Sequence, residues 1–129
     1  MSAGAWLKAR RRRGQRRRVA FSQGACLACE FAARHPRGYA AVLALSGGLI
    51  GPPGTPRDDA GSLAGVEIFL GCGVPDAHVP FERVTETGKI FARLGAAVDV
   101  RPYPGMPHTI NRDEVDACRA ILRRRFGFR

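Results

Sequence analysis

The segment Ala-Phe-Ser-Gln-Gly at residues 20–24 places a serine between a short apolar run and an alanine-rich stretch. Residues 19–21 are typical of the end of a strand, and residues 24–34 are typical of a helix. Ser22 at such a turn, with the small residues Ala20 and Gly24 two positions away on each side, predicts a nucleophile elbow. A larger side chain at position 20 or 24 would collide with the neighbouring backbone. The following helix N-terminus favours developing negative charge. The alternative is that Ser22 only caps that helix.

An aspartate and a histidine follow two later strand patterns. Asp76 lies in a loop just beyond the apolar run 66–70, and His108 lies beyond the run 97–102. The order serine, aspartate, histidine is the chain order of the α/β-hydrolase triad, so we expect Asp76 as the acid and His108 as the base. Asp76 also fits an ordinary turn residue after Pro75, and His108 also fits a surface loop. His78 is an alternative base beside Asp76.

Four sequence blocks carry a more specific resemblance. They are Phe-Ser-Gln-Gly-Ala (21–25), Leu-Ala-Leu-Ser-Gly-Gly-Leu (43–49), Asp-x-His-Val-Pro (76–80) and Tyr-Pro-Gly-Met-Pro-His-Thr (103–109). From about residue 19 onward the chain resembles the phospholipase/carboxylesterase branch of the α/β-hydrolases, which includes serine carboxylesterases, lysophospholipases and acyl-protein thioesterases. This resemblance implies cleavage of a small-molecule ester or thioester without metal or organic cofactor. It assigns the nucleophile to Ser22, the acid to Asp76, the base to His108 and one oxyanion donor to the backbone amide of Gln23.

The resemblance also implies that a complete member of the family has further strands before the serine. Several strands and a loop with the second oxyanion donor precede the serine in such proteins, whereas 21 residues precede Ser22. We therefore expect the C-terminal part of the fold, truncated and impaired in activity. We also expect the elbow strand to form one edge of the sheet, with its outer side unpaired and prone to self-association.

The order of the remaining patterns predicts an α/β fold. Strand patterns near 18–21, 39–45, 66–70 and 97–102 alternate with helix patterns at 24–34, 80–94 and 112–125. This alternation predicts about four parallel strands with flanking helices and right-handed crossovers. Residues 46–64, rich in glycine and proline, predict a long loop. Active residues at the carboxyl ends of strands are typical of this architecture.

The first 18 residues differ in composition from the rest. They carry Lys8 and the arginines at 10–13 and 16–18 without an acidic residue, and the whole chain has 21 basic and 11 acidic residues and a net charge of +10. We expect residues 1–18 to be a disordered leader and residues 19–129 to be the partial domain. A basic arm of this kind also fits binding to nucleic acid or an anionic membrane. The competing function is therefore a catalytically inactive remnant that acts through this arm or through its sheet edge.

Cysteine usage and hydropathy favour a cytoplasmic protein. Four cysteines suggest reduced thiols more than a disulfide framework. Cys26 and Cys29 form a C-x-x-C pattern inside the first predicted helix. We expect both to pack as small buried hydrophobic side chains, and a zinc or redox site is the alternative. No apolar run approaches the roughly 20 residues that span a bilayer. The first apolar residues, 5–7, are too few for a signal-peptide core.

Overall fold

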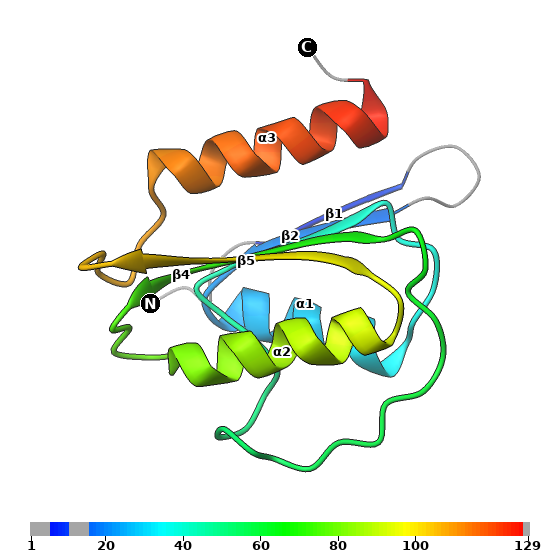
Figure 1. Ribbon diagram of the computed structural model, residues 1–129. Coiled ribbons are helices and arrows are strands. Elements are labelled where there is room, and N and C mark those ends of the chain that lie inside the picture. The colour runs from blue at the N-terminus through cyan, green and yellow to red at the C-terminus, as the bar shows by residue number, and fades with distance from the viewer. Residues whose placement is uncertain (1–5, 11–15, 128–129) are drawn as a thin grey trace.

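The computed structural model describes residues 6–10 and 16–127, which form one sheet with helices on both faces (Figure 1). Helices α1 and α2 cover one face, and α3 covers the other. The strands are β1 (Trp6–Arg10), β2 (Arg16–Phe21), β3 (Ala41–Leu45), β4 (Glu67–Val74) and β5 (Ala97–Pro104). The helices are α1 (Gln23–Arg34), α2 (Phe81–Arg93) and α3 (Arg112–Phe126). All of these except β1 follow the sequence-based expectation within a few residues.

Strands β2 to β5 are parallel and lie beside one another in chain order. Leu43 of β3 is level with Val19 of β2 on one side and with Phe69 of β4 on the other. Each crossover runs through a helix or the long loop, which is the connection that parallel strands require. The predicted α/β class with four parallel strands is confirmed.

The prediction that the strand before Ser22, β2, forms an edge of the sheet was wrong. β1 pairs antiparallel with β2, with Trp6 opposite Ala20 and Arg10 opposite Arg16, so the elbow strand has a neighbour on both sides. The backbone of residues 6–10 thus takes the outer hydrogen-bonding positions of β2 that we expected to be open. The predicted disordered leader is therefore also wrong for residues 6–10 and 16–18, which are strands. Residues 1–5 and 11–15 lie outside the described residues.

Two cores lie on the two faces of the sheet. On β3, Ala41, Leu43 and Leu45 point to the α3 side, where they pack with Phe69, Cys118 and Ile121. The alternate residues Val42 and Ala44 point to the α1 and α2 side, in a larger cluster that includes Ile68, Leu70, Val84 and Phe91. β3 is buried at all five positions. The continuous apolar run of this strand is therefore explained by helices on both faces.

Helix α2 also presents polar groups to the protein interior. Arg83 is 2% exposed, and its guanidinium donates to the carbonyl oxygens of Leu49 and Ile50 at 3.0 and 2.8 Å. Thr87 is fully buried and its Oγ1 accepts from the Leu49 amide at 2.9 Å. Residues 49 and 50 lie outside the strands, so their backbone groups need other hydrogen-bond partners. Arg83 and Thr87 supply these partners and hold the segment after β3 against α2.

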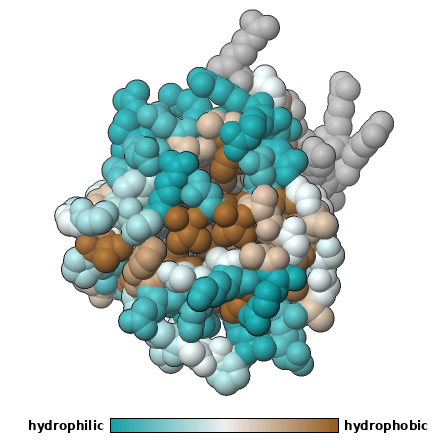
Figure 2. Space-filling view, viewed as in Figure 1, coloured by the Kyte–Doolittle hydropathy of each residue, from teal (hydrophilic) through white to brown (hydrophobic). Residues whose placement is uncertain are grey.

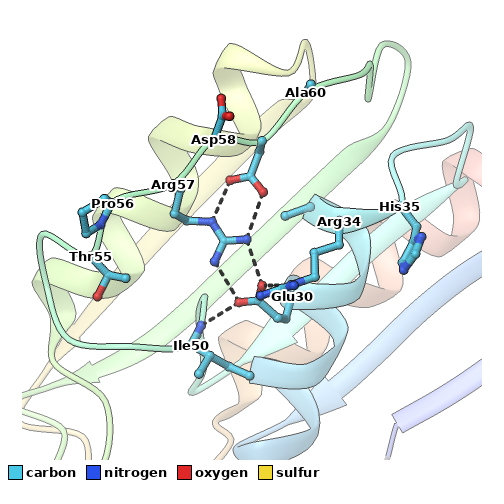
Figure 3. Close-up of a pocket in the computed structure, with 11 residues that line it drawn as sticks. Glu30, Arg34, His35, Ile50, Thr55, Pro56, Arg57, Asp58 and Ala60 are labelled. Atoms are coloured by element: carbon cyan, nitrogen blue, oxygen red, sulfur yellow. Dashed lines mark hydrogen bonds and ion pairs between the residues drawn. The ribbon is translucent and has the colours of Figure 1, made fainter.

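The long loop 46–66 is attached to α1 by a charged cluster. The Arg57 guanidinium donates to both oxygens of Glu30 at 2.9 Å and to both oxygens of Asp59. Glu30 also accepts from Arg34 and from the Ile50 amide, as Figure 3 shows. Burial alone would raise the pKa of Glu30, but the hydrogen bonds from Arg57, Arg34 and Ile50 outweigh it and lower the pKa to about 2. The cluster lines a hollow beside α1 that contains none of the predicted site residues.

The other sheet edge is β5. Apolar side chains form a band across this face of the molecule, over β5 between α3 and α2 (Figure 2). Val98 and Val100 of β5 are partly buried and pack against the larger core. Within the part of the chain that the structure describes, no helix is long and apolar enough to cross a membrane.

Candidate active site

Ser22 occupies a strained turn between β2 and α1. Its φ and ψ are 60° and −124°, and it is one of two non-glycine residues with positive φ among the described residues. Such a conformation costs about 1–3 kcal/mol and persists only where surrounding contacts impose it. The Ser22 amide donates to the Leu45 carbonyl at 2.9 Å, and the Ser22 carbonyl accepts from the Cys26 amide at 3.1 Å. The side chain makes no capping hydrogen bond to α1, so the alternative role as a helix cap was wrong.

Gly47 packs directly beneath this turn. A Cβ at position 47 would lie 2.5 Å from the Ala25 Cβ, 2.9 Å from the Ser22 carbonyl oxygen and 3.0 Å from the Cys26 nitrogen. All three atoms belong to the turn or to the first part of α1. Only glycine therefore allows the segment after β3 to approach the elbow this closely.

The structure brings Ser22, His108 and Asp76 together in a chain of hydrogen bonds. Ser22 Oγ lies 2.8 Å from His108 Nε2, and His108 Nδ1 lies 2.7 Å from Asp76 Oδ2. Ser22 comes from the β2–α1 turn, Asp76 from the segment after β4 and His108 from the segment after β5. The carboxyl ends of parallel strands meet at one edge of the sheet, and this places the three residues side by side.

Asp76 is held on both of its oxygens. Its side chain is completely buried, and Oδ1 accepts from the amides of His78 and Val79 at 2.7 and 2.9 Å. Burial alone would raise the pKa of this carboxyl. The hydrogen bonds from His108 and the two amides outweigh burial and lower the pKa of Asp76 below its usual range. Asp76 is therefore a carboxylate at neutral pH, oriented toward His108.

Two rings contact the imidazole of His108. The ring of Phe21, the last residue of β2, lies 5.1 Å from it between centroids, and the ring of His78 lies 4.3 Å away. His78 is exposed, and its contact with Asp76 is made by the backbone amide. The ring of His108, and not that of His78, is hydrogen-bonded to both Ser22 and Asp76, so the geometry favours His108 as the base.

The Gln23 amide lies at the N-terminus of α1, directly after Ser22. Gln23 is the first residue of α1, where amides have no partner within the helix, and the residue is exposed. The positive end of the helix dipole lies at the same point. A negative charge that forms at this end of α1 is therefore favoured by the helix dipole.

The C-x-x-C pattern lies on α1 as expected. Cys29 is fully buried, Cys26 is partly exposed, and burial raises the pKa of the Cys29 thiol. No group of three or more histidine, cysteine, aspartate or glutamate side chains in residues 6–10 and 16–127 has the arrangement of a metal site. Cys29 packs within the larger core, whereas Cys26 lies outside this cluster.

The sequence profile of the phospholipase/carboxylesterase family matches residues 5–125. The chain belongs to this family. A search of curated proteins found no match. The family match starts before β2 and includes β1, which lies in the segment that we predicted to be a disordered leader.

Solved structures of esterases have the same fold. A phospholipase/carboxylesterase from Dyadobacter fermentans is 40% identical, with a TM-score of 0.74, over 81% of this chain and 50% of its own. Esterase PE8 is 29% identical with a TM-score of 0.68, over 84% of this chain and 49% of its own. A Bacillus cereus carboxylesterase is 17% identical with a TM-score of 0.69, over 82% and 48%. This family member thus spans about half the length of the structures it matches.

Sequence reasoning did not find the residues that support the site. Gly47 and Ser46 belong to the quoted Leu-Ala-Leu-Ser-Gly-Gly-Leu block, but that block indicated only the family. Gly73 lies in β4, where any Cβ would overlap the Met106 carbonyl of the segment that carries His108. Gly47 and Gly73 are visible in the sequence as glycines near the ends of two strands. The atoms that approach them closely belong to distant parts of the chain and are known only from the structure.

Proposed function

We propose that this chain is a serine hydrolase that cleaves carboxylic ester or thioester bonds with Ser22, His108 and Asp76. The observation that carries the proposal is the continuous chain of hydrogen bonds from Ser22 Oγ through the imidazole to the buried carboxylate. A serine hydroxyl is a weak nucleophile by itself and needs an adjacent base that a third group orients. The three residues have this relation here.

The reaction proceeds in two steps of acyl transfer. His108 Nε2 takes the proton of Ser22 Oγ as the oxygen attacks the acyl carbonyl carbon. His108 then donates that proton to the departing alcohol or thiol, leaving an acyl-serine. Water, deprotonated by the same nitrogen, attacks the acyl-serine. The bond to Ser22 Oγ then breaks, the acid leaves, and His108 returns the proton to Ser22 Oγ. Asp76 keeps the proton-bearing Nδ1 of His108 directed toward itself and stabilises the imidazolium that forms.

The Gln23 amide stabilises the oxyanion in both steps. An amide at the first position of α1 adds its N–H and the helix dipole to the developing charge. The resemblance places the second donor in a segment before the elbow strand. Loss of a single oxyanion donor lowers turnover by roughly 10²–10³-fold, which is the contribution that we expect of the Gln23 amide.

Hydrolysis of p-nitrophenyl acetate and butyrate by the purified chain tests the proposal. We expect turnover that Ser22→Ala abolishes and that Asp76→Asn lowers by about 10³–10⁴-fold, because the asparagine stabilises the wrong imidazole tautomer. His35→Ala is the matched control, since His35 lies at the C-terminal end of α1 and contacts Phe31. Equal rates for the unaltered chain and Ser22→Ala would contradict the proposal.

A further inference from the structure

Glu114 is a buried carboxyl that the proposed reaction does not use. It lies in the first turn of α3 and has no exposed surface. Its amide donates to Asn111 Oδ1 at 2.8 Å, and its Oε1 accepts from the Asn111 amide at 3.1 Å, which forms a capping box. Its other oxygen, Oε2, is buried with no hydrogen-bond partner among the described residues.

The free oxygen lies against the middle of the sheet. A Cβ at Gly71 of β4 would overlap Glu114 Oε2, so the carboxyl rests on the bare Cα of this glycine. The Gly71 carbonyl accepts from the Ser46 amide at 2.7 Å, and Ser46 Oγ donates to the Thr109 carbonyl at 3.4 Å. Glu114 and Ser46 thus contact the same point of β4 and both hold the segment that follows His108.

We propose that Glu114 is a positioning residue for His108, because it joins the N-terminus of α3 to β4 and so fixes residues 109–111. The effect on turnover depends on the proposed ester hydrolysis, whereas the effects on stability and on the His108 ring do not. A base must lie within hydrogen-bond distance of its nucleophile, and a displacement of about 1 Å can cost roughly a hundredfold in rate. Two of the three residues after His108 are bonded to this support, Thr109 through Ser46 and Asn111 through Glu114.

The surroundings of Glu114 favour the protonated carboxyl. Glu114 interacts electrostatically with Asp113 and Cys118 of α3, Cys72 of β4 and Tyr103 of β5, and none of these is a cation. The cation Arg101 of β5 also faces α3, where it is paired with Asp113 and Asp99. Burial raises the pKa of Glu114; the Asn111 amide opposes this effect, and Asp113 adds to it. Because the folded-state pKa is raised, the neutral form stabilises the fold fully at acid pH. This contribution is lost as pH rises through the folded-state pKa.

Urea unfolding between pH 4 and pH 9 tests the protonation state without any need for activity. We expect Glu114→Gln to gain stability relative to the unaltered chain as pH rises, because glutamine keeps the hydrogen bond to Asn111 and never ionises. Parallel stability curves for the two proteins over this range would overturn the inference that the carboxyl is protonated, whether or not the chain hydrolyses esters.

Turnover and the nitrogen signals of the His108 ring test the positioning role. We expect Glu114→Gln to keep kcat within about threefold, and Glu114→Ala to lower kcat by about tenfold or more with little change in KM. In Glu114→Ala, but not in Glu114→Gln, the ring signals should shift, and this readout serves even if the chain has no esterase activity. Glu30→Ala is the control, because Glu30 is also buried but lies outside the site. A folded Glu114→Ala with unchanged kcat and ring signals would overturn the proposal.

Gly71→Ala gives a second test in which the carboxyl is retained. The added methyl group must displace Glu114 Oε2, so we expect the loss of kcat and the ring shifts seen in Glu114→Ala. In a chain that already carries Glu114→Ala, the same change should have little further effect on kcat. Independent, additive losses would contradict a shared support.

Discussion

At the scale of single residues, the strain at Ser22 depends on contacts that only small neighbours allow. Ala20 is buried at the end of β2, and Gly47 touches both the serine carbonyl and the first turn of α1. A positive φ at a serine is unfavourable by itself, so packing around the turn must hold it there. The same packing directs Oγ toward His108.

Gly47→Ala is expected to distort this turn. The methyl group would lie 2.5–3.0 Å from three atoms of the elbow, and overpacking of this kind costs about 1–3 kcal/mol. We expect a lower melting temperature and at least about a tenfold loss of esterase kcat, because Ser22 moves relative to His108. Gly38→Ala is the matched control, since a Cβ at Gly38 meets no atom within 4 Å. Equal effects of the two substitutions would show that the close approach does not support the elbow.

The site residues and their supports differ in how far sequence reveals them. Ser22, Asp76 and His108 each follow a recognisable strand pattern, and the structure places all three within one hydrogen-bonded chain. Glu114 and Ser46 have no such local signal. Glu114 resembles an ordinary acidic residue in the first turn of a helix until its contact with Gly71 is known.

At the scale of elements, apolar periodicity predicted every helix and the four parallel strands. It did not predict β1, because a run of basic residues is typical of a solvated tail as well as of an edge strand. Nor did it predict Arg83 and Thr87 on the inner side of α2. Their partners are carbonyl and amide groups of the loop after β3, and a periodic pattern contains no information about such groups.

The attachment of the long loop to α1 is expected to depend on pH. The pKa of Glu30 is lowered to about 2 from an ordinary value of 4.5, so its ionised form stabilises the fold above about pH 4.5. This contribution, about 3 kcal/mol, is lost as pH falls toward 2. We expect Glu30→Gln to be less stable at pH 7 and to lose less stability on acidification, as measured by urea unfolding.

Asp58→Asn is the control for this experiment. Asp58 lines the same hollow but is exposed, and the guanidinium of Arg57 is bonded to Glu30 and Asp59 instead, so Asp58→Asn keeps the charged cluster intact. If Glu30→Gln and the unaltered chain lost stability equally between pH 5 and pH 2, the charged cluster would not be what holds the loop.

At the scale of the whole molecule, the site assembles within a chain that spans about half the length of its solved relatives. The sheet has a core on each face, and the three site residues come from the ends of three of its strands. The fold described here therefore contains all three members of the proposed triad. We propose that this arrangement activates Ser22.

Covalent labelling with a fluorophosphonate, located by mass spectrometry, measures this activation, because the reagent needs an activated serine but no particular substrate pocket. We predict one label per chain on Ser22, blocked by Ser22→Ala and strongly slowed by His108→Ala, since His108 removes the hydroxyl proton. Labelling of Ser22 at the same rate with and without His108, or no labelling of Ser22 in the folded chain, would contradict the claim.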